Sequence, residues 1–288
     1  MRNWLLAIRF KTLSAAISPV ILGSSLAFHD GIFYPFVFFM TLLASILIQI
    51  GTNFANDVYD YEKGSDREDR LGPLRATQMG LILPITMKKA MWLTFFFSIC
   101  IGFYLVMIGG WPIICIGLLS IASGIAYTGG PYPLGYYGFG DVFVFIFFGI
   151  IAVSGTYYLQ TGVVNFEVIL LGVSIGMLST AVLVVNNLRD INADKISGKR
   201  TLAVLFGEKF TKFEYSILML LPFFFPIYMW LKFQNEFSLF ITIFALPISL
   251  YLVKDIYNRS GRELNNILAR TSRFLFVFSC LLSIGLIL

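Results

Sequence analysis

Long apolar runs separated by short polar segments dominate this chain. Each run is long enough for a helix to cross the roughly 30 Å hydrocarbon core of a bilayer. The pattern therefore predicts an all-α integral membrane protein with about nine transmembrane helices, forming a single domain over residues 1–288. The expected spans lie at about 12–29, 33–55, 90–109, 111–128, 141–159, 165–187, 213–231, 236–253 and 270–288.

Two polar segments break this pattern with acidic residues. The first follows the second apolar run, extends from Asn53 to Thr77, and holds six of the sixteen acidic residues of the chain. Asn53, Asp57 and Asp60 are spaced so that a helix places them on one face. Two ionised carboxylates about 4 Å apart repel by roughly 4 kcal/mol at an effective dielectric constant near 20, which favours a bound cation. Clustered oxygen ligands suit Mg²⁺, although a solvated acidic loop without a ligand is the alternative.

The second polar segment, Asn186 to Thr201, has the same plan. Asn186, Asp190 and Asp194 again stand at helical spacing. Each motif follows a long apolar run and passes into a segment with glycine and basic residues: Gly72 and Arg75 after the first, and Gly198, Lys199 and Arg200 after the second. Two such motifs indicate metal ions held against a polyanion, most simply a diphosphate.

Composition and charge support the membrane assignment and suggest an orientation. The chain is 58% hydrophobic and only 13% charged, which is far more apolar than a soluble domain of this length. Twenty of its 21 basic residues fall in segments on one predicted side, and only Lys232 falls on the other. Since cytoplasmic segments are enriched in Lys and Arg, we expect the N-terminus and both acidic motifs to be cytoplasmic and the C-terminus to be outside. The net charge of +5 is then a topology signal and does not indicate nucleic-acid binding.

A third polar segment, Tyr127 to Asp141, is rich in glycine, proline and tyrosine. It cannot form a regular helix, and it lies on the same predicted side as both acidic motifs. We therefore expect it to form a wall or lid over the site, with Asp141 at the first turn of the following helix. The only histidine, His29, falls at the opposite end of the first span, so a histidine general base is not expected.

The two acidic motifs resemble those of a known family. NDVYD (Asn56 to Asp60) and DINAD (Asp190 to Asp194) are similar to the paired motifs of the UbiA superfamily of intramembrane aromatic prenyltransferases, and the resemblance covers almost the whole chain. Within that superfamily, the longer phrases look most like the subgroup that acts on 1,4-dihydroxy-2-naphthoate in menaquinone synthesis: RFKTL, NDVYDYEKGSDREDRLGPLR, YTGGPYPLGYYGFGD and NNLRDINADKISGKRTLAV. Two positions depart from the usual pattern. Gly64 stands where a third motif aspartate is common, so that the next acid is Asp66, and Phe10 stands where proline is common.

The resemblance implies a UbiA-type helical bundle with an active-site cavity on the cytoplasmic side. It implies Mg²⁺-dependent transfer of a polyprenyl group from polyprenyl diphosphate to 1,4-dihydroxy-2-naphthoate, with loss of CO₂, giving demethylmenaquinone. The implied catalytic residues are Asp57, Asp60, Asp190 and Asp194. The implied metal ligands are these four with Asn56 and Asp66, and the implied diphosphate contacts are Arg75, Lys199 and Arg200.

Other functions remain open on the sequence alone. A UbiA-type enzyme could use another aromatic acceptor, such as 4-hydroxybenzoate, with the same metal and diphosphate chemistry. A membrane phosphotransferase of the CDP-alcohol type also needs metal and acidic residues, but the chain lacks the continuous motif of that family. A cation transporter would place ionisable residues near the middle of the membrane, whereas these motifs lie at one end of their helices.

Overall fold

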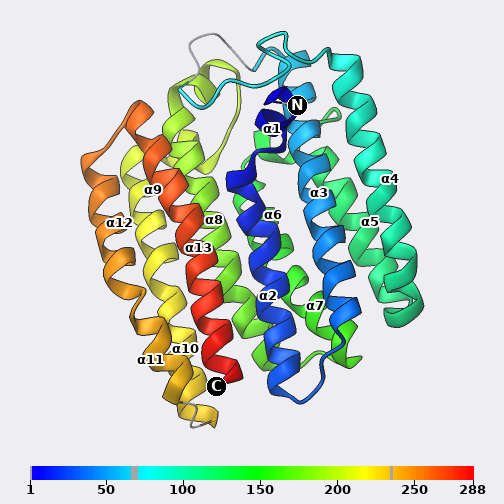
Figure 1. Ribbon diagram of the computed structural model, residues 1–288. Coiled ribbons are helices and arrows are strands. Elements are labelled where there is room, and N and C mark those ends of the chain that lie inside the picture. The colour runs from blue at the N-terminus through cyan, green and yellow to red at the C-terminus, as the bar shows by residue number, and fades with distance from the viewer. Residues whose placement is uncertain (1, 66–70, 234–235) are drawn as a thin grey trace.

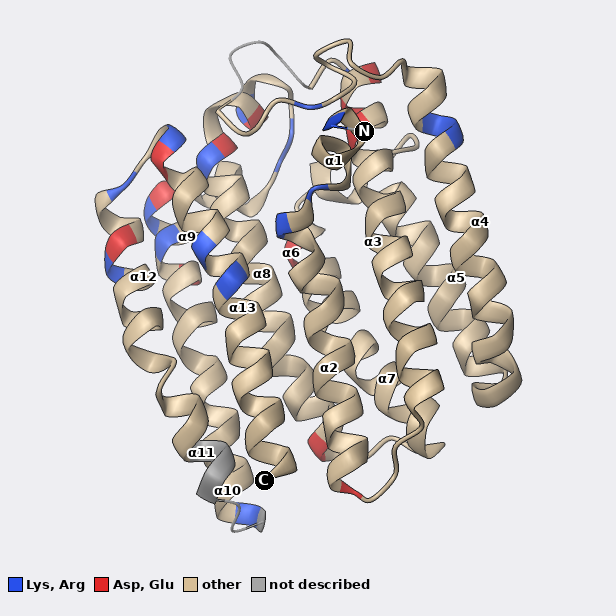
Figure 2. Cartoon of the chain, in the orientation of Figure 1, with Lys and Arg blue, Asp and Glu red and all other residues tan. Residues whose placement is uncertain are grey.

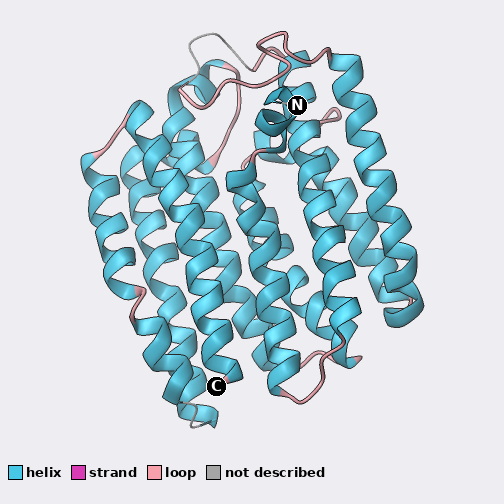
Figure 3. Ribbon diagram, in the orientation of Figure 1, coloured by secondary structure: helices cyan, strands magenta, loops and turns pink. Residues whose placement is uncertain are grey.

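A computed structural model describes residues 2–65, 71–233 and 236–288, and every regular element in these ranges is helical (Figure 3). The elements in chain order are α1 (Arg2–Ile8), η1 (Phe10–Thr12), α2 (Leu13–His29), α3 (Pro35–Glu62), α4 (Pro84–Gly109), α5 (Trp111–Ala126), η2 (Leu134–Tyr136), α6 (Gly140–Val144), η3 (Phe145–Ile151), α7 (Ala152–Thr161), α8 (Phe166–Ile196), α9 (Leu202–Leu220), η4 (Leu221–Phe223), α10 (Phe224–Phe233), α11 (Glu236–Ile243), α12 (Leu246–Asn258), η5 (Gly261–Glu263) and α13 (Leu264–Ile287).

Among the described residues, eight helical stretches are long and apolar enough to cross a membrane. A further apolar helix, α5, has 16 residues and is shorter than the roughly 20 that a span usually needs. The prediction of about nine spans is therefore close. The main differences are that α3 and α8 run several residues past the predicted ends of their spans. As a result, both acidic motifs lie within continuous helix.

The long helices lie side by side, and the N- and C-termini are at opposite ends of the bundle (Figure 1). Figure 2 shows that Lys and Arg gather mainly at the end that carries the N-terminus. The end of α3, the end of α8 and the segment between α5 and α6 all meet at this end (Figure 1). We refer to it below as the motif end.

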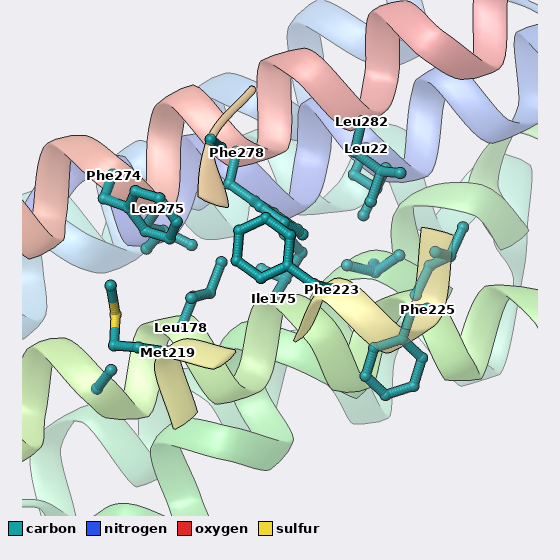
Figure 4. Close-up of a cluster of buried hydrophobic side chains, with 14 of the residues drawn as sticks. Leu22, Ile175, Leu178, Met219, Phe223, Phe225, Phe274, Leu275, Phe278 and Leu282 are labelled. Carbon is teal, nitrogen blue, oxygen red and sulfur yellow. The ribbon is translucent and has the colours of Figure 1, made fainter. Parts of the chain in front are cut away.

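The main core is centred on α8. Leu171, Ile175 and Leu178 have no exposed surface there, and they pack with side chains of α2, α13 and η4 (Figure 4). The rings of Phe223 and Phe278 meet edge to face with 5.3 Å between their centroids. Since lipid is as apolar as these side chains, close packing rather than water exclusion holds such helices together.

The first acidic motif is held by a separate apolar cluster at the motif end. Phe54, Ala55 and Val58 of α3 pack there with Met87 and Met91 of α4. These contacts fix one face of α3 and so fix the rotation of the helix. The face that carries Asp57 and Asp60 is thereby directed toward the interior of the motif end.

Candidate functional site

Asp60, in the last turns of α3, is the most heavily paired carboxylate of the first motif. It is 2% exposed, and the Arg75 guanidinium lies 2.6 Å from its Oδ2. Tyr136 donates its hydroxyl hydrogen to Oδ1 of Asp60 at 2.8 Å. Arg75 also donates to the backbone carbonyl of Asn56, so the guanidinium binds α3 at two points.

Asp57 fixes the segment that carries Arg75. Its carboxylate accepts the backbone N–H groups of Ala76 at 3.2 Å and Thr77 at 3.0 Å. These bonds hold residues 75–77 against α3, although more than fifteen residues separate them along the chain. Asp57 therefore contributes to the site at least by orienting Arg75.

The two asparagines of the first motif have different partners. Asn56 Oδ1 accepts a hydrogen bond from the Thr128 hydroxyl at 2.9 Å, which joins α3 to the glycine-rich segment. Asn53 instead donates to the carbonyl of Ile8 at 2.8 Å and to Thr12 Oγ1 at 3.0 Å. The polar face predicted for α3 is thus divided, because Asn53 faces the N-terminal segment while Asp60 faces the second motif.

Lys199 links the two acidic motifs. Its ammonium nitrogen lies 3.5 Å from Oδ1 of Asp194 and 3.8 Å from Oδ1 of Asp60, and it lies 4.6 Å from the centre of the Tyr136 ring. The structure therefore brings together four of the residues singled out from the sequence: Asp60, Arg75, Asp194 and Lys199.

Asp190 has a different environment from Asp194. Both of its carboxylate oxygens accept hydrogen bonds from Arg189, at 2.8 and 2.5 Å. Arg189 is 3% exposed and also donates to Asn186 Oδ1 at 2.8 Å. Sequence reasoning missed Arg189, although a basic residue beside a motif aspartate at the end of a long apolar helix is a signal for a functional ion pair.

Arg200, also predicted from the sequence, does not join these four residues. The Arg200 side chain is exposed, while its backbone N–H donates to the carbonyl of Tyr136 at 2.7 Å. Asp66 lies outside the described residues.

The glycine-rich segment between α5 and α6 forms a wall of the site, as expected. Tyr136 binds both Asp60 and, at 2.5 Å, the Ser65 hydroxyl. Burial and the negative charge of Asp60 raise the pKa of the Tyr136 hydroxyl above its usual value, so it stays a hydrogen-bond donor. Gly138 has φ 82°, and a Cβ there would lie 3.0 Å from the carbonyl oxygen of Arg200. Glycine is thus required both by the backbone conformation and by the close approach of the two segments.

An apolar cavity of about 480 Å³ lies beside the acidic cluster, between α2, α3, α4, α5, η3 and α7. Tyr127 lines the cavity, and its neighbour Thr128 binds Asn56, so the cavity and the first motif adjoin. Phe103 of α4 and Leu118 of α5 also line it and are 68% and 58% exposed. The cavity therefore extends from the motif end to the outer, lipid-facing surface of the bundle.

The side chains around Lys199 suit a hard divalent ion that takes only some of its ligands from the protein. Within the described residues, no three His, Cys, Asp or Glu side chains lie close enough together to hold a metal ion. Asp60 and Asp194, however, both approach one positive group, the Lys199 ammonium. Mg²⁺ is usually bound through one or two carboxylates together with water and substrate phosphates. The donor set matches that mode.

The sequence is similar to those of known prenyltransferases. Residues 16–279 match the UbiA prenyltransferase family. The chain is 43% identical over 211 residues to the 1,4-dihydroxy-2-naphthoate octaprenyltransferase of Escherichia coli (strain K12), covering 71% of this chain and 68% of that protein. It is 34% identical over 297 residues to the enzyme of the same name from Haemophilus influenzae, covering 100% of this chain and 96% of that protein.

Solved structures share the fold at low sequence identity. A UbiA homologue from Archaeoglobus fulgidus bound to GPP and Mg²⁺ superposes with a TM-score of 0.70 at 14% identity, covering 99% of both chains. A UbiA homologue from Aeropyrum pernix K1 gives a TM-score of 0.73 at 11% identity, covering 97% of this chain and 98% of that one. From its helical bundle, its paired acidic motifs and the match along nearly its whole length, the chain belongs to the UbiA prenyltransferase family.

Proposed function

We propose that this protein transfers a polyprenyl group from polyprenyl diphosphate to 1,4-dihydroxy-2-naphthoate with loss of CO₂, in a Mg²⁺-dependent reaction, and that residues 1–288 act as one prenyltransferase domain. The observation that carries the proposal is the meeting of Asp60, Asp194, Arg75 and Lys199 beside an apolar cavity. A charged head group and a long apolar tail need these two environments side by side. The naphthoate acceptor is supported by the names of the E. coli and H. influenzae relatives.

In this proposal the acidic motifs hold the metal and the basic residues hold the diphosphate. Asp60 and Asp194 are the main ligands, with Asn56, Asp57 and Asp190 beside them, and Asp66 as a further ligand. Bound Mg²⁺ would stabilise the negative charge that develops on the departing diphosphate. Arg75 and Lys199, which now neutralise the carboxylates, would turn toward phosphate oxygens, with Arg200 reaching in from its exposed position.

The cavity shelters the reacting carbon. When the allylic carbon–oxygen bond breaks, diphosphate takes the electron pair and leaves an electron-poor prenyl carbon. Phe143 and Phe147, which line the cavity and stack with 5.8 Å between ring centroids, offer π faces to such a cation. The apolar lining also keeps out the water that would otherwise capture it.

Loss of CO₂ removes the need for a strong base. The ring carbon that carries the carboxylate forms the new bond to the prenyl carbon, and the carboxylate then leaves as CO₂, so that its bonding electrons restore the aromatic ring. No proton is taken from that carbon. This balance is consistent with the position of the only histidine, His29, which binds the carbonyl of Leu286 at the opposite end of the bundle.

We also propose that the motif end faces the cytoplasm, because basic residues gather there. Donor and acceptor would then reach the site from the cytoplasmic side, and the prenyl chain would extend through the open side of the cavity into the bilayer.

The test is a transfer assay with purified protein, Mg²⁺ and a long polyprenyl diphosphate. We expect 1,4-dihydroxy-2-naphthoate to be prenylated, with one CO₂ released per product. A product that keeps its carboxylate in mass spectrometry, or turnover with 4-hydroxybenzoate alone, would leave the family assignment standing and overturn the acceptor assignment. Removal of divalent metal by EDTA should abolish turnover, and Mg²⁺ should restore it.

A further inference from the structure

The buried guanidinium of Arg189 is hydrogen-bonded to three side chains. Its guanidinium donates to both oxygens of Asp190, to Asn186 Oδ1, and to Asn265 Oδ1 at 2.9 Å. At 3% exposure it is an expensive group to bury unless every bond is made. The arrangement therefore fixes the guanidinium and the Asp190 carboxylate as one unit.

Asn265 connects the Arg189–Asp190 pair to other parts of the chain. It lies in the first turn of α13, where its side-chain oxygen accepts from Arg189. Its side-chain nitrogen donates to the carbonyl of Leu71 at 2.9 Å and to the carbonyl of Arg262 at 3.0 Å. Leu71 precedes the segment in which Asp57 binds the backbone of Ala76 and Thr77.

These bonds form one continuous path from the second motif to the first: Asp190, Arg189, Asn265, Leu71, and then the segment that carries Arg75. We propose that Arg189 and Asn265 form a positioning bridge that sets the distance between the two acidic motifs. Neither residue is assigned a contact with substrate. That the two motifs bind metal and diphosphate rests on the proposed function, whereas the hydrogen bonds of the bridge do not depend on it.

Two features make the bridge more than a local packing contact. Asn265 uses both ends of its amide: its oxygen accepts from Arg189 of α8, and its nitrogen donates to the carbonyl of Leu71, in the segment after α3. The fork of Arg189 is also planar and holds Asp190 through two parallel bonds, a geometry that lysine cannot reproduce. Groups that orient metal ligands without touching the metal typically change metal affinity about 10- to 100-fold when removed.

The primary test measures Mn²⁺ affinity from the EPR signal of free Mn²⁺, in the presence of an unreactive thio analogue of a prenyl diphosphate. We expect Asn265→Ala to weaken Mn²⁺ binding about tenfold, because Arg189 and Leu71 both lose their shared partner. Asn265→Asp keeps an acceptor for Arg189 but cannot donate to Leu71, so an intermediate loss is expected. Arg189→Lys should weaken binding at least as much as Asn265→Ala. Asn258→Ala is the matched control, because Asn258 is exposed at the same end and binds only the carbonyl of Lys254 within its own helix among the bonds described.

A second readout needs no ligand. Spin labels at Leu74→Cys and Ile196→Cys, both exposed positions at the ends of the bridged segments, report the distance between the motifs by pulsed EPR once the three native cysteines are replaced. Asn265→Ala should broaden that distance distribution, and Asn258→Ala should leave it unchanged.

The outcomes separate the bridge from the proposed function. Unchanged Mn²⁺ affinity and an unchanged distance distribution in Asn265→Ala would overturn the bridge, whatever the acceptor is. A wild-type protein that fails to prenylate naphthoate, but whose Asn265→Ala variant shows both changes, would overturn the proposed acceptor and leave the bridge in place. In an active enzyme, the bridge also predicts that Asn265→Ala raises KM for the prenyl diphosphate about tenfold while kcat changes less than threefold. A purely structural role would lower the unfolding temperature without this split.

Discussion

Asp60 and Arg75 form a buried ion pair with 2.6 Å between the guanidinium and the carboxylate, and they are 2% and 8% exposed. Fourteen residues separate them along the chain, and the backbone contacts of Asp57 with Ala76 and Thr77 are what bring them together. Buried charges of this kind are stable only when paired. When substrate binds, the carboxylate can exchange its pairing with arginine for pairing with a metal ion, and the arginine can then pair with phosphate.

Asp60→Asn should reduce kcat for prenyl transfer by about 100-fold or more, because it removes one fixed charge from a preorganised electrostatic site. The measurement is steady-state turnover with Mg²⁺, a prenyl diphosphate and naphthoate. Glu208→Gln is the matched control, since Glu208 is also a paired carboxylate at the motif end but is 55% exposed and binds Lys212 instead. Turnover of Asp60→Asn within threefold of wild type would exclude Asp60 from the reaction.

Tyr136→Phe should remove a pH-dependent contribution of the Tyr136 hydroxyl to the stability of the folded protein. Burial raises the pKa of the Tyr136 hydroxyl above its ordinary value of 10.0, as does the neighbouring Asp60. A raised pKa in the folded state means that the folded protein holds the proton more tightly than the unfolded chain. The stabilisation is therefore complete below pH 10 and declines as the pH rises toward the folded-state pKa. We expect the difference in unfolding temperature between wild type and Tyr136→Phe, measured in detergent, to shrink from pH 8 to pH 11. A constant difference would show that the hydroxyl adds no proton-linked stability.

The orientation proposal can be tested by cysteine labelling in a variant without Cys100, Cys115 and Cys280. Ile196→Cys, at the end of α8, and Val163→Cys, at the opposite end of the bundle, are 62% and 60% exposed as isoleucine and valine. An impermeant maleimide should label position 196 from the cytoplasmic side only and position 163 from the outside only. The reverse result would place the active site outside the cytoplasm.

The helical bundle could be predicted well from the sequence because a membrane span is a local property. Twenty apolar residues in a row predict a helix without knowledge of its neighbours, and in the described part of the chain eight of the predicted spans are helices of sufficient length. The acidic motifs were also visible, since helical spacing places Asp190 and Asp194 near one face. The partners of these residues were not visible. Whether Asp190 meets Arg189 or Lys199 depends on side-chain direction, and the link to Asn265 joins positions 76 residues apart.

Gly117 offers a test of the cavity as the site of the prenyl chain. It lies in α5 and lines the cavity, and a Cβ built there has no neighbour within 4 Å. A larger side chain therefore projects into open space, and replacing glycine within a helix also favours the helix by up to about 1 kcal/mol. Gly117 is ten residues below Tyr127, which corresponds to roughly 15 Å along a helix.

A side chain at that depth should obstruct a long prenyl chain more than a short one. We expect Gly117→Leu to raise KM for a long polyprenyl diphosphate about tenfold, while KM for geranyl diphosphate changes less than threefold, because two isoprene units end above the obstruction. Gly117→Ala is the control, since a single methyl group leaves most of the cavity open. An equal increase for both donors would mean that the leucine disturbs the head-group site, and no increase for either would mean that the prenyl chain runs elsewhere.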